Sequence, residues 1–264
     1  MMIVFILLVI TFVQICQLNA GICTFPSASK TVTVQSTISV STSTDYNNTL
    51  FVGGSSILNG ECEVDNSKLI YLMSLKNGVT IQNAIFDTPG LGIYCEGSCI
   101  LKNIYYKQLC YHAAGFGYKS TSTSYTYQVI GGAGQGSPDK YFTQSGKGTT
   151  TIKNFCGEGS YGKLWCSCGN CAFQTARTVQ ISSTVLKGPG LTVVSLNSNY
   201  GDKMSLSGLT LQGQKSSSTK TKYICQTYKG LTYMASMTPL SSFTPTESGT
   251  GTCSYSTSAI TISS

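Results

Sequence analysis

A three-residue unit returns along the middle of the chain and limits what the chain can fold into. Each copy has an apolar residue, then usually a polar one, and then a small or amide residue. The copies are Ile81-Gln82-Asn83, Leu101-Lys102-Asn103, Val129-Ile130-Gly131, Ile152-Lys153-Asn154, Ile181-Ser182-Ser183 and Leu206-Ser207-Gly208. Successive apolar anchors lie 20, 28, 23, 29 and 25 residues apart. No long amphipathic helix pattern separates them.

Short strands that recur at this interval, with Gly, Ser and Asn between them, predict a solenoid in which stacked coils bury one another's apolar faces. We therefore predict an all-β, right-handed parallel β-helix. The alternative is an antiparallel β-sandwich, which also uses short strands and frequent turns. Because Asn83, Asn103 and Asn154 share one repeat position, we expect their amides to stack in a ladder from coil to coil.

The first twenty residues are apolar and contain no charged side chain. That length and composition predict a cleaved secretory signal rather than a membrane span. We expect residues 21–264 to form one secreted β-helix domain, with a covering tail from about Ser216 onward.

Cysteine usage agrees with an oxidising compartment, where most thiols form disulfides. Of twelve cysteines, Cys16 lies in the predicted signal, so eleven remain and at least one has no partner within the chain. The closely spaced pairs Cys95/Cys99 and Cys168/Cys171 are expected disulfides, and Cys225 and Cys253 are expected to anchor the tail. Zinc is disfavoured because the cluster offers no fourth ligand; a free Cys166 is the remaining alternative.

The chain is basic, with seventeen Lys plus Arg against ten Asp plus Glu. Arg177 is the sole arginine, so the cationic groups are almost all lysines. A basic secreted protein favours a polyanion such as nucleic acid, an anionic membrane or an acidic polysaccharide. An ordinary soluble surface is an equally good explanation of the charge alone.

Motifs between about residues 30 and 230 occur in a recognisable order. They are Asn77–Asn83, Thr88–Gly90, Gly92–Cys95, Gly97–Cys99, Asp139-Lys140, Gly162–Leu164, Cys168–Cys171, Asn197–Asp202 and Ile224–Gly230. As an ordered set they resemble the class III pectate lyases, polysaccharide lyase family 3, which are secreted β-helix enzymes.

The resemblance implies β-elimination on polygalacturonate. A base removes the proton next to the uronate carboxylate, and the 4-linked oxygen departs. Lys140 matches the proposed base, and Lys163 matches a second lysine that binds the substrate carboxylate. The family uses calcium held by Asp and Glu oxygens, which suit a hard cation. The implied partner is pectate rather than nucleic acid or a membrane, and the implied state is a monomer.

Several positions depart from the family pattern. Acidic positions of the family are occupied by Leu91, Lys107 and His112, and a family arginine by Cys166. Asp139 is then the one weak candidate for a metal ligand, so we expect calcium sites to be largely lost.

Two functions therefore follow from the sequence. The first is a pectate lyase, in which Lys107 is a third substrate-binding candidate that could replace the calcium charge. The second is a non-catalytic descendant that binds pectate or another partner. Sixteen tyrosines add either structural stacks, which we favour, or a sugar-binding platform.

Overall fold

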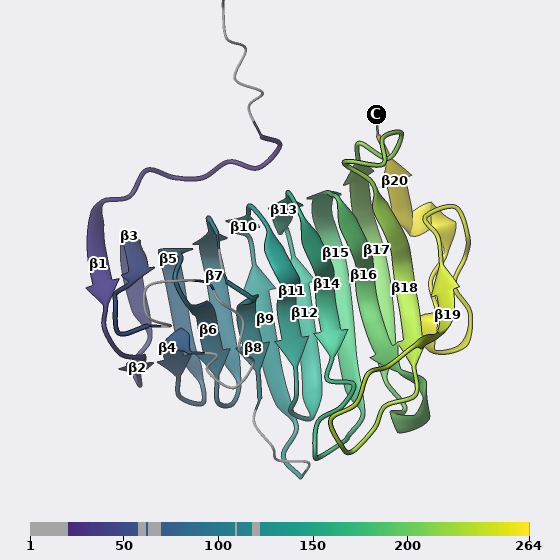
Figure 1. Cartoon of the computed structure of the whole chain (residues 1–264), viewed down its shortest axis with the longest axis horizontal. Coiled ribbons are helices and arrows are strands. Elements are labelled where there is room, and N and C mark those ends of the chain that lie inside the picture. The colour runs from purple at the N-terminus through teal and green to yellow at the C-terminus, as the bar shows by residue number, and fades with distance from the viewer. Residues whose placement is uncertain (1–20, 58–61, 63–69, 109, 118–121, 264) are drawn as a thin grey trace, which may run out of the picture.

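The chain winds into a right-handed parallel β-helix whose coils stack side by side along the long axis of the molecule (Figure 1). The computed structural model describes residues 21–57, 62, 70–108, 110–117 and 122–263. The predicted signal, residues 1–20, lies outside this range.

Two sheets contain all the named strands. The first sheet contains β1 (Lys30–Val34), β3 (Thr44–Gly53), β5 (Val79–Asp87), β7 (Cys99–Tyr106), β9 (Tyr125–Ile130), β10 (Ala133–Gly134), β12 (Gly148–Lys153), β13 (Cys156–Glu158), β15 (Arg177–Lys187), β17 (Lys203–Gln212) and β20 (Ile260–Ile262). The second contains β2 (Ile38–Val40), β4 (Tyr71–Leu75), β6 (Leu91–Cys95), β8 (His112–Phe116), β11 (Ser137–Gln144), β14 (Tyr161–Ser167), β16 (Gly190–Asn197), β18 (Thr221–Tyr228) and β19 (Pro239–Phe243).

Helical structure within the described ranges is limited to short 3-10 turns at η3 (Ser198–Tyr200), η4 (Gly251–Cys253) and η5 (Thr257–Ala259). A search of the same residues for a helix able to cross a membrane finds none.

The predicted apolar anchors pair with one another across successive strands of the first sheet. In coil order they are Ile81, Leu101, Val129, Ile152, Ile181 and Leu206. The first five are at most 2% exposed, and Leu206 is half-buried against the same core. Because all these pairings are parallel and in register, they confirm the β-helix and exclude the antiparallel sandwich.

The third residue of each repeat unit is the corner of its coil. Asn83, Asn103, Asn154 and Ser183 have φ between 49° and 57°, and the two glycines at this position also have positive φ. Asparagine tolerates this left-handed conformation better than most residues, and glycine adopts it freely. The third position of the repeat therefore marks where the backbone bends from one side of the coil to the next.

The amide ladder extends over one step. Asn103 Nδ2 donates to Asn83 Oδ1 at 3.3 Å. The next coil has Gly131 at this position, where a Cβ would lie 2.5 Å from Asn103 Oδ1. Because Gly131 stands between Asn103 and Asn154 and has no amide, the prediction of a continuous stack reaching Asn154 was wrong.

The segment after β18 closes the last coils, and the Cys225–Cys253 disulfide ties it to β18, which is itself a parallel strand of the second sheet. Strand β20 extends the first sheet in parallel, whereas β19 pairs antiparallel with β18, an exception to the predicted parallel order. Disulfides Cys95–Cys99 and Cys168–Cys171 confirm the two predicted pairs, and Cys225–Cys253 joins the two cysteines that were expected to anchor the tail. Cys23–Cys156 and Cys62–Cys110 were not predicted. Among the described cysteines Cys166 is the free one, and it is buried.

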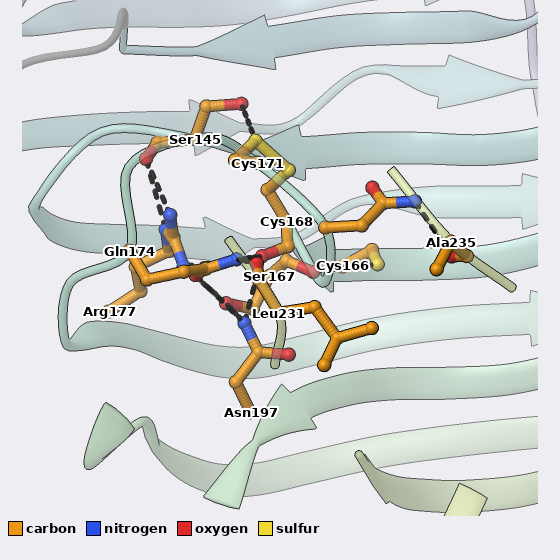
Figure 2. Close-up of a disulfide and its surroundings, with 11 residues drawn as sticks. Ser145, Cys166, Ser167, Cys168, Cys171, Gln174, Arg177, Asn197, Leu231 and Ala235 are labelled. Carbon is orange, nitrogen blue, oxygen red and sulfur yellow. Dashed lines mark hydrogen bonds between the residues drawn. A yellow bond between two sulfur atoms is a disulfide. The ribbon is translucent and has the colours of Figure 1, made fainter. Parts of the chain in front are cut away.

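The sole arginine lies inside the fold, beside the Cys168–Cys171 disulfide (Figure 2). The Arg177 guanidinium donates to the carbonyl oxygen of Ser145, to Ser167 Oγ and to Gln174 Oε1, at 2.7 to 3.1 Å. Its backbone N–H donates to Asp202 Oδ1 at 2.9 Å. We call these residues the Arg177 cluster, and its bonds fasten the turn after β14 to the start of β15.

Candidate functional site

A groove of about 1000 Å³ lies on the outer face of the second sheet, over β11, β14, β16 and β18. Its charged residues are Asp139, Lys140, Lys163 and Lys222. Segment 234–239 of the tail forms one wall. Among the residues that the structure describes, three lysines and a single carboxylate therefore line this groove.

The sheet register brings the two predicted catalytic lysines together. Lys140 pairs with Lys163 across β11 and β14, and with His112 across β8 and β11. Strands in register lie about 4.8 Å apart, so these side chains are close neighbours. Gly162 lets the backbone of β14 lie close to that of β11, since a Cβ at Gly162 would lie 2.2 Å from the Asp139 carbonyl oxygen.

A β-bulge brings Asp139 and Lys140 into the same groove although they are consecutive residues. The register between β11 and β14 shifts between Ser137 and Lys140. Ser137 is fully buried, and its Oγ lies 2.8 Å from the carbonyl oxygen of Tyr111 and 2.6 Å from that of Lys140. Bulges redirect side chains in this way beside many functional sites.

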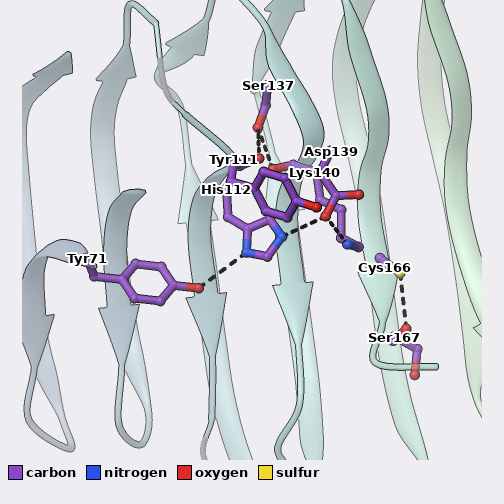
Figure 3. Close-up of polar contacts among 8 residues, drawn as sticks. All are labelled: Tyr71, Tyr111, His112, Ser137, Asp139, Lys140, Cys166 and Ser167. Atoms are coloured by element: carbon purple, nitrogen blue, oxygen red, sulfur yellow. Dashed lines mark hydrogen bonds and ion pairs between the residues drawn. The ribbon is translucent and has the colours of Figure 1, made fainter. Parts of the chain in front are cut away.

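Asp139 is the centre of a short polar chain (Figure 3). Its Oδ2 lies 2.9 Å from His112 Nε2 and accepts a bond from Lys140 Nζ. On the other side of the imidazole, Tyr71 Oη lies 3.5 Å from His112 Nδ1. The side chains of His112, Lys140 and Asp139 are 12%, 19% and 23% exposed, so the contacts are partly shielded from water.

The protonation states along this chain follow from burial and from its neighbours. Burial lowers the pKa of His112 below its ordinary value, although the Asp139 carboxylate opposes this. Burial acts to raise the pKa of Asp139, but the bond from His112 and the charge of Lys140 outweigh it, and the pKa lies below its ordinary value. Near neutral pH the His112 imidazole is therefore neutral and the Asp139 carboxyl group is an anion.

Aromatic rings support the other two lysines. Lys163 Nζ lies 6.0 Å from the centre of the Tyr228 ring, and Lys222 Nζ lies 5.0 Å from the centre of the Tyr223 ring. Both distances fall within the range in which a cation is attracted to a ring face. Burial raises the pKa of Tyr228, so its hydroxyl stays neutral and donates to Gln226 Oε1 at 3.2 Å.

Lys107 lines a second hollow, of about 630 Å³, and does not line the groove. Lys187 and Glu158 share that hollow with it. Pro138 also lines the second hollow, and the next residue, Asp139, lines the groove. The second hollow and the groove therefore meet at the bulge in β11. The structure thus brings Asp139, Lys140 and Lys163 together and places Lys107 beyond one end of them.

The position of the family arginine is not filled by another arginine. Cys166 lines the groove, the residue is 6% exposed, and its Sγ donates to the Ser167 carbonyl oxygen at 3.1 Å. Arg177 is committed to its own buried cluster. The cationic groups of the groove are therefore lysine ammonium groups, which lack the planar fork of a guanidinium.

The oxygen donors of the groove do not fit calcium. Calcium takes six to eight oxygen ligands, several of them carboxylates. Asp139 is the single carboxylate among the described lining residues, and its Oδ2 already accepts from His112 and Lys140. A cation there would also face the ammonium groups of Lys140 and Lys163, so like charges oppose its binding.

Sequence reasoning missed the contributions of His112, Tyr71, Lys222 and Tyr223. The register that brings β18 beside β16, and β16 beside β14, could not be read from spacing alone. The one available signal was the alternation in β18, where Lys222 is exposed just after buried Thr221.

Fold and groove together define a class: a parallel β-helix protein with a lysine-lined groove on one sheet. The pectate lyase family model matches residues 22–234. The chain belongs to the pectate lyase family.

Fungal relatives and solved bacterial structures give the extent of the likeness. Probable pectate lyase E of Neosartorya fischeri is 32% identical over 206 residues, which span 78% of this chain and 75% of the relative. Pectate lyase E of Emericella nidulans is 36% identical over 157 residues, which span 59% of this chain and 57% of the relative.

The catalytic domain of pectate lyase PelI from Erwinia chrysanthemi superposes with a TM-score of 0.70 at 25% identity, covering 88% of this chain and 99% of the domain. PelI in complex with tetragalacturonic acid gives a TM-score of 0.69 at 26% identity, covering 87% of this chain and 70% of PelI.

Proposed function

We propose that this protein binds pectate, an acidic polysaccharide, in the groove on its second sheet. The observation on which this rests is the in-register pair Lys140 and Lys163, with Lys222 beyond it, in a groove lined by one described carboxylate. A polyuronate offers one carboxylate per sugar, which matches a row of ammonium groups. The tetragalacturonic acid held by PelI supports this choice of ligand.

Binding in this groove does not depend on calcium, because lysines supply the positive charge. The test is a titration of size-defined oligogalacturonates into the protein by calorimetry, in excess chelator and then with calcium. Equal affinity in both conditions is expected, falling with added salt because the contacts are ionic. No binding in chelator would refute the proposal.

A matched pair of variants ties the binding to the groove. Lys163→Ala removes a groove charge, whereas Lys153→Ala removes one exposed charge on the opposite sheet. Loss of affinity in the first variant alone is expected. Equal losses in both would mean that the ligand responds to net charge and not to this site.

β-Elimination is the second candidate, favoured by the family membership and by Lys140 standing beside Lys163. In this reaction a neutral Lys140 amine takes the proton next to the uronate carboxylate, and the 4-linked oxygen leaves with the electron pair of the broken bond. Lys163 neutralises the carboxylate as charge develops on it. Before acting, the Lys140 ammonium must lose its proton while paired with Asp139.

The absorbance of unsaturated products distinguishes the two functions. Binding with no product in calcium or in chelator identifies a non-catalytic descendant. Product that persists in chelator and disappears in Lys140→Ala identifies a calcium-independent lyase. Lys107→Ala is the companion variant, because Lys107 lines the second hollow, which adjoins the groove at the bulge in β11, and its charge could replace that of calcium.

The surroundings in which this function operates are also a proposal. Disulfides form and persist in oxidising compartments, and the described residues contain five of them. They support a secreted protein that meets pectate outside the cell. We propose that it acts as a monomer, which light scattering with and without ligand would test.

A further inference from the structure

We propose that His112, assisted by Tyr71, is a positioning residue that fixes Lys140 through Asp139. This rests on the proposed binding function, since Lys140 is taken as a contact for the uronate carboxylate. The imidazole lies behind Asp139 and is itself only 12% exposed. It therefore acts on the groove through its neighbour rather than by touching the ligand.

The direction of each hydrogen bond is set by its chemistry. An ionised carboxylate can only accept, so His112 Nε2 carries the proton that is shared with Asp139 Oδ2 at 2.9 Å. The other ring nitrogen of a neutral imidazole is then an acceptor. Burial raises the pKa of Tyr71, with the Asp139 charge adding to the effect, so the phenol stays protonated and donates to Nδ1.

The strands leave space for the contacts between Tyr71, His112 and Asp139. Tyr71 comes from β4 and crosses toward β8, where Gly115 makes room: a Cβ there would lie 2.3 Å from the Tyr71 hydroxyl. On the other side the Tyr111 ring lies against the imidazole, with 5.0 Å between ring centres. His112 is thus held from two sides, which leaves its ring little freedom to turn.

The charges around His112 explain what the chain does. Asp139 attracts a proton to the imidazole, whereas the Lys140 and Lys163 ammonium groups and burial oppose it. The result is a neutral donor that stabilises the Asp139 anion without cancelling its charge. That anion in turn holds Lys140 Nζ at the groove floor. A lysine that is already ordered loses less side-chain entropy when a ligand binds.

Two measurements test the positioning role of His112, and one of them is independent of pectate. The first follows the Asp139 carboxyl by carbon NMR during an acid titration and the Lys140 ammonium by its nitrogen signal, without ligand. The second is the affinity for oligogalacturonate at neutral pH. The variants are His112→Leu, which removes the donor, His112→Gln, whose amide can replace Nε2, and Tyr71→Phe, which removes one hydroxyl.

For His112→Leu, the pKa of Asp139 should rise and the affinity should fall about tenfold, as expected for loss of one charge-assisted hydrogen bond. His112→Gln should restore affinity to within about threefold of the original. Tyr71→Phe should have a smaller effect than His112→Leu, because the 3.5 Å contact is the longer one.

The outcomes separate this inference from the proposed function. An unchanged Asp139 titration and Lys140 signal in both His112→Leu and Tyr71→Phe would overturn the positioning role. If the original protein fails to bind pectate while the Asp139 titration still follows His112, the binding proposal fails and the positioning role stands. Should His112→Leu not fold, Tyr71→Phe takes its place, with His112→Gln as the control that keeps a donor to Asp139: a wild-type Asp139 titration and Lys140 signal in Tyr71→Phe then overturn the role.

Discussion

Two polar clusters lie on neighbouring coils and differ in how their donors are used. In the Arg177 cluster, the guanidinium N–H groups donate hydrogen bonds to oxygen atoms of the protein, and the Arg177 side chain is fully buried. Around Asp139, the Lys140 ammonium has three donors and one described partner, and its side chain is 19% exposed at the groove. The first cluster holds the fold together. The second retains capacity for an outside anion.

The type of charge therefore does not identify the site. Arg177, the one arginine of the chain, is structural, and the cations of the groove are lysines. A donor counts toward recognition when its hydrogen bonds are not already used within the protein.

Removing the guanidinium should produce the largest effect. Arg177→Met removes the guanidinium donors of the Ser145 carbonyl oxygen, Ser167 Oγ and Gln174 Oε1, and it leaves the buried Asp202 without its compensating cation. We expect a loss of about 3–5 kcal/mol in the free energy of unfolding, as when one partner of a buried charged network is removed. Chemical denaturation measures it.

The matched control for stability is Lys153→Met, a substitution of an exposed cation on β12. A change within about 0.5 kcal/mol is expected there. If Arg177→Met costs as little as the control, the two clusters do not differ in the way described.

The reverse pattern is expected in the groove. Lys163→Ala should weaken oligogalacturonate binding about tenfold, the effect of losing one ionic contact. Its unfolding free energy should change by less than about 1 kcal/mol, because the lost cation–ring contact is weak at a solvent-open site. Calorimetry and denaturation on the same preparation compare the two. A larger loss of stability than of affinity would place Lys163 with the structural residues.

The smallest effect is a difference in acid response between two aspartates. The pKa of Asp139 is lowered in the fold, so its contribution to stability is complete above the unfolded pKa of about 3.9 and is lost as the pH falls toward the lower folded value. Asp139→Asn should therefore flatten the dependence of unfolding free energy on pH below about pH 4.

Burial raises the pKa of Asp202, despite the bonds it accepts. Its anion therefore costs stability at neutral pH, and this cost disappears as the pH falls through the raised folded value. A carbon NMR titration should place the two carboxyls on opposite sides of the ordinary value. Finding both on one side would remove this distinction between the clusters.

The parts of the molecule that were predictable depend on local pattern. The anchors at Ile81 and Ile152 were correct because burial follows from one position in each coil. Cys95–Cys99 was correct because the two cysteines are four residues apart.

What could not be predicted depends on register between distant segments. Asp139 meets His112 because β8 and β11 align across a turn of the helix whose length varies from coil to coil, and because a bulge turns Asp139 into the groove. Cys23–Cys156 joins residues separated by 133 positions. The continuous amide ladder failed because Gly131 satisfies the corner conformation without supplying an amide.

The aligned row across the second sheet has one further consequence. His112, Lys140, Lys163, Thr192 and Tyr223 occupy matching positions on five successive strands. For the proposed polymer lying along the axis, Lys140 and Lys163 give two charge contacts about 4.8 Å apart. Only two adjacent steps are cationic, and aromatic or neutral side chains flank them. A polymer displaced by one coil loses one of these two charge contacts. The row therefore favours one register of the polymer along the groove and opposes sliding.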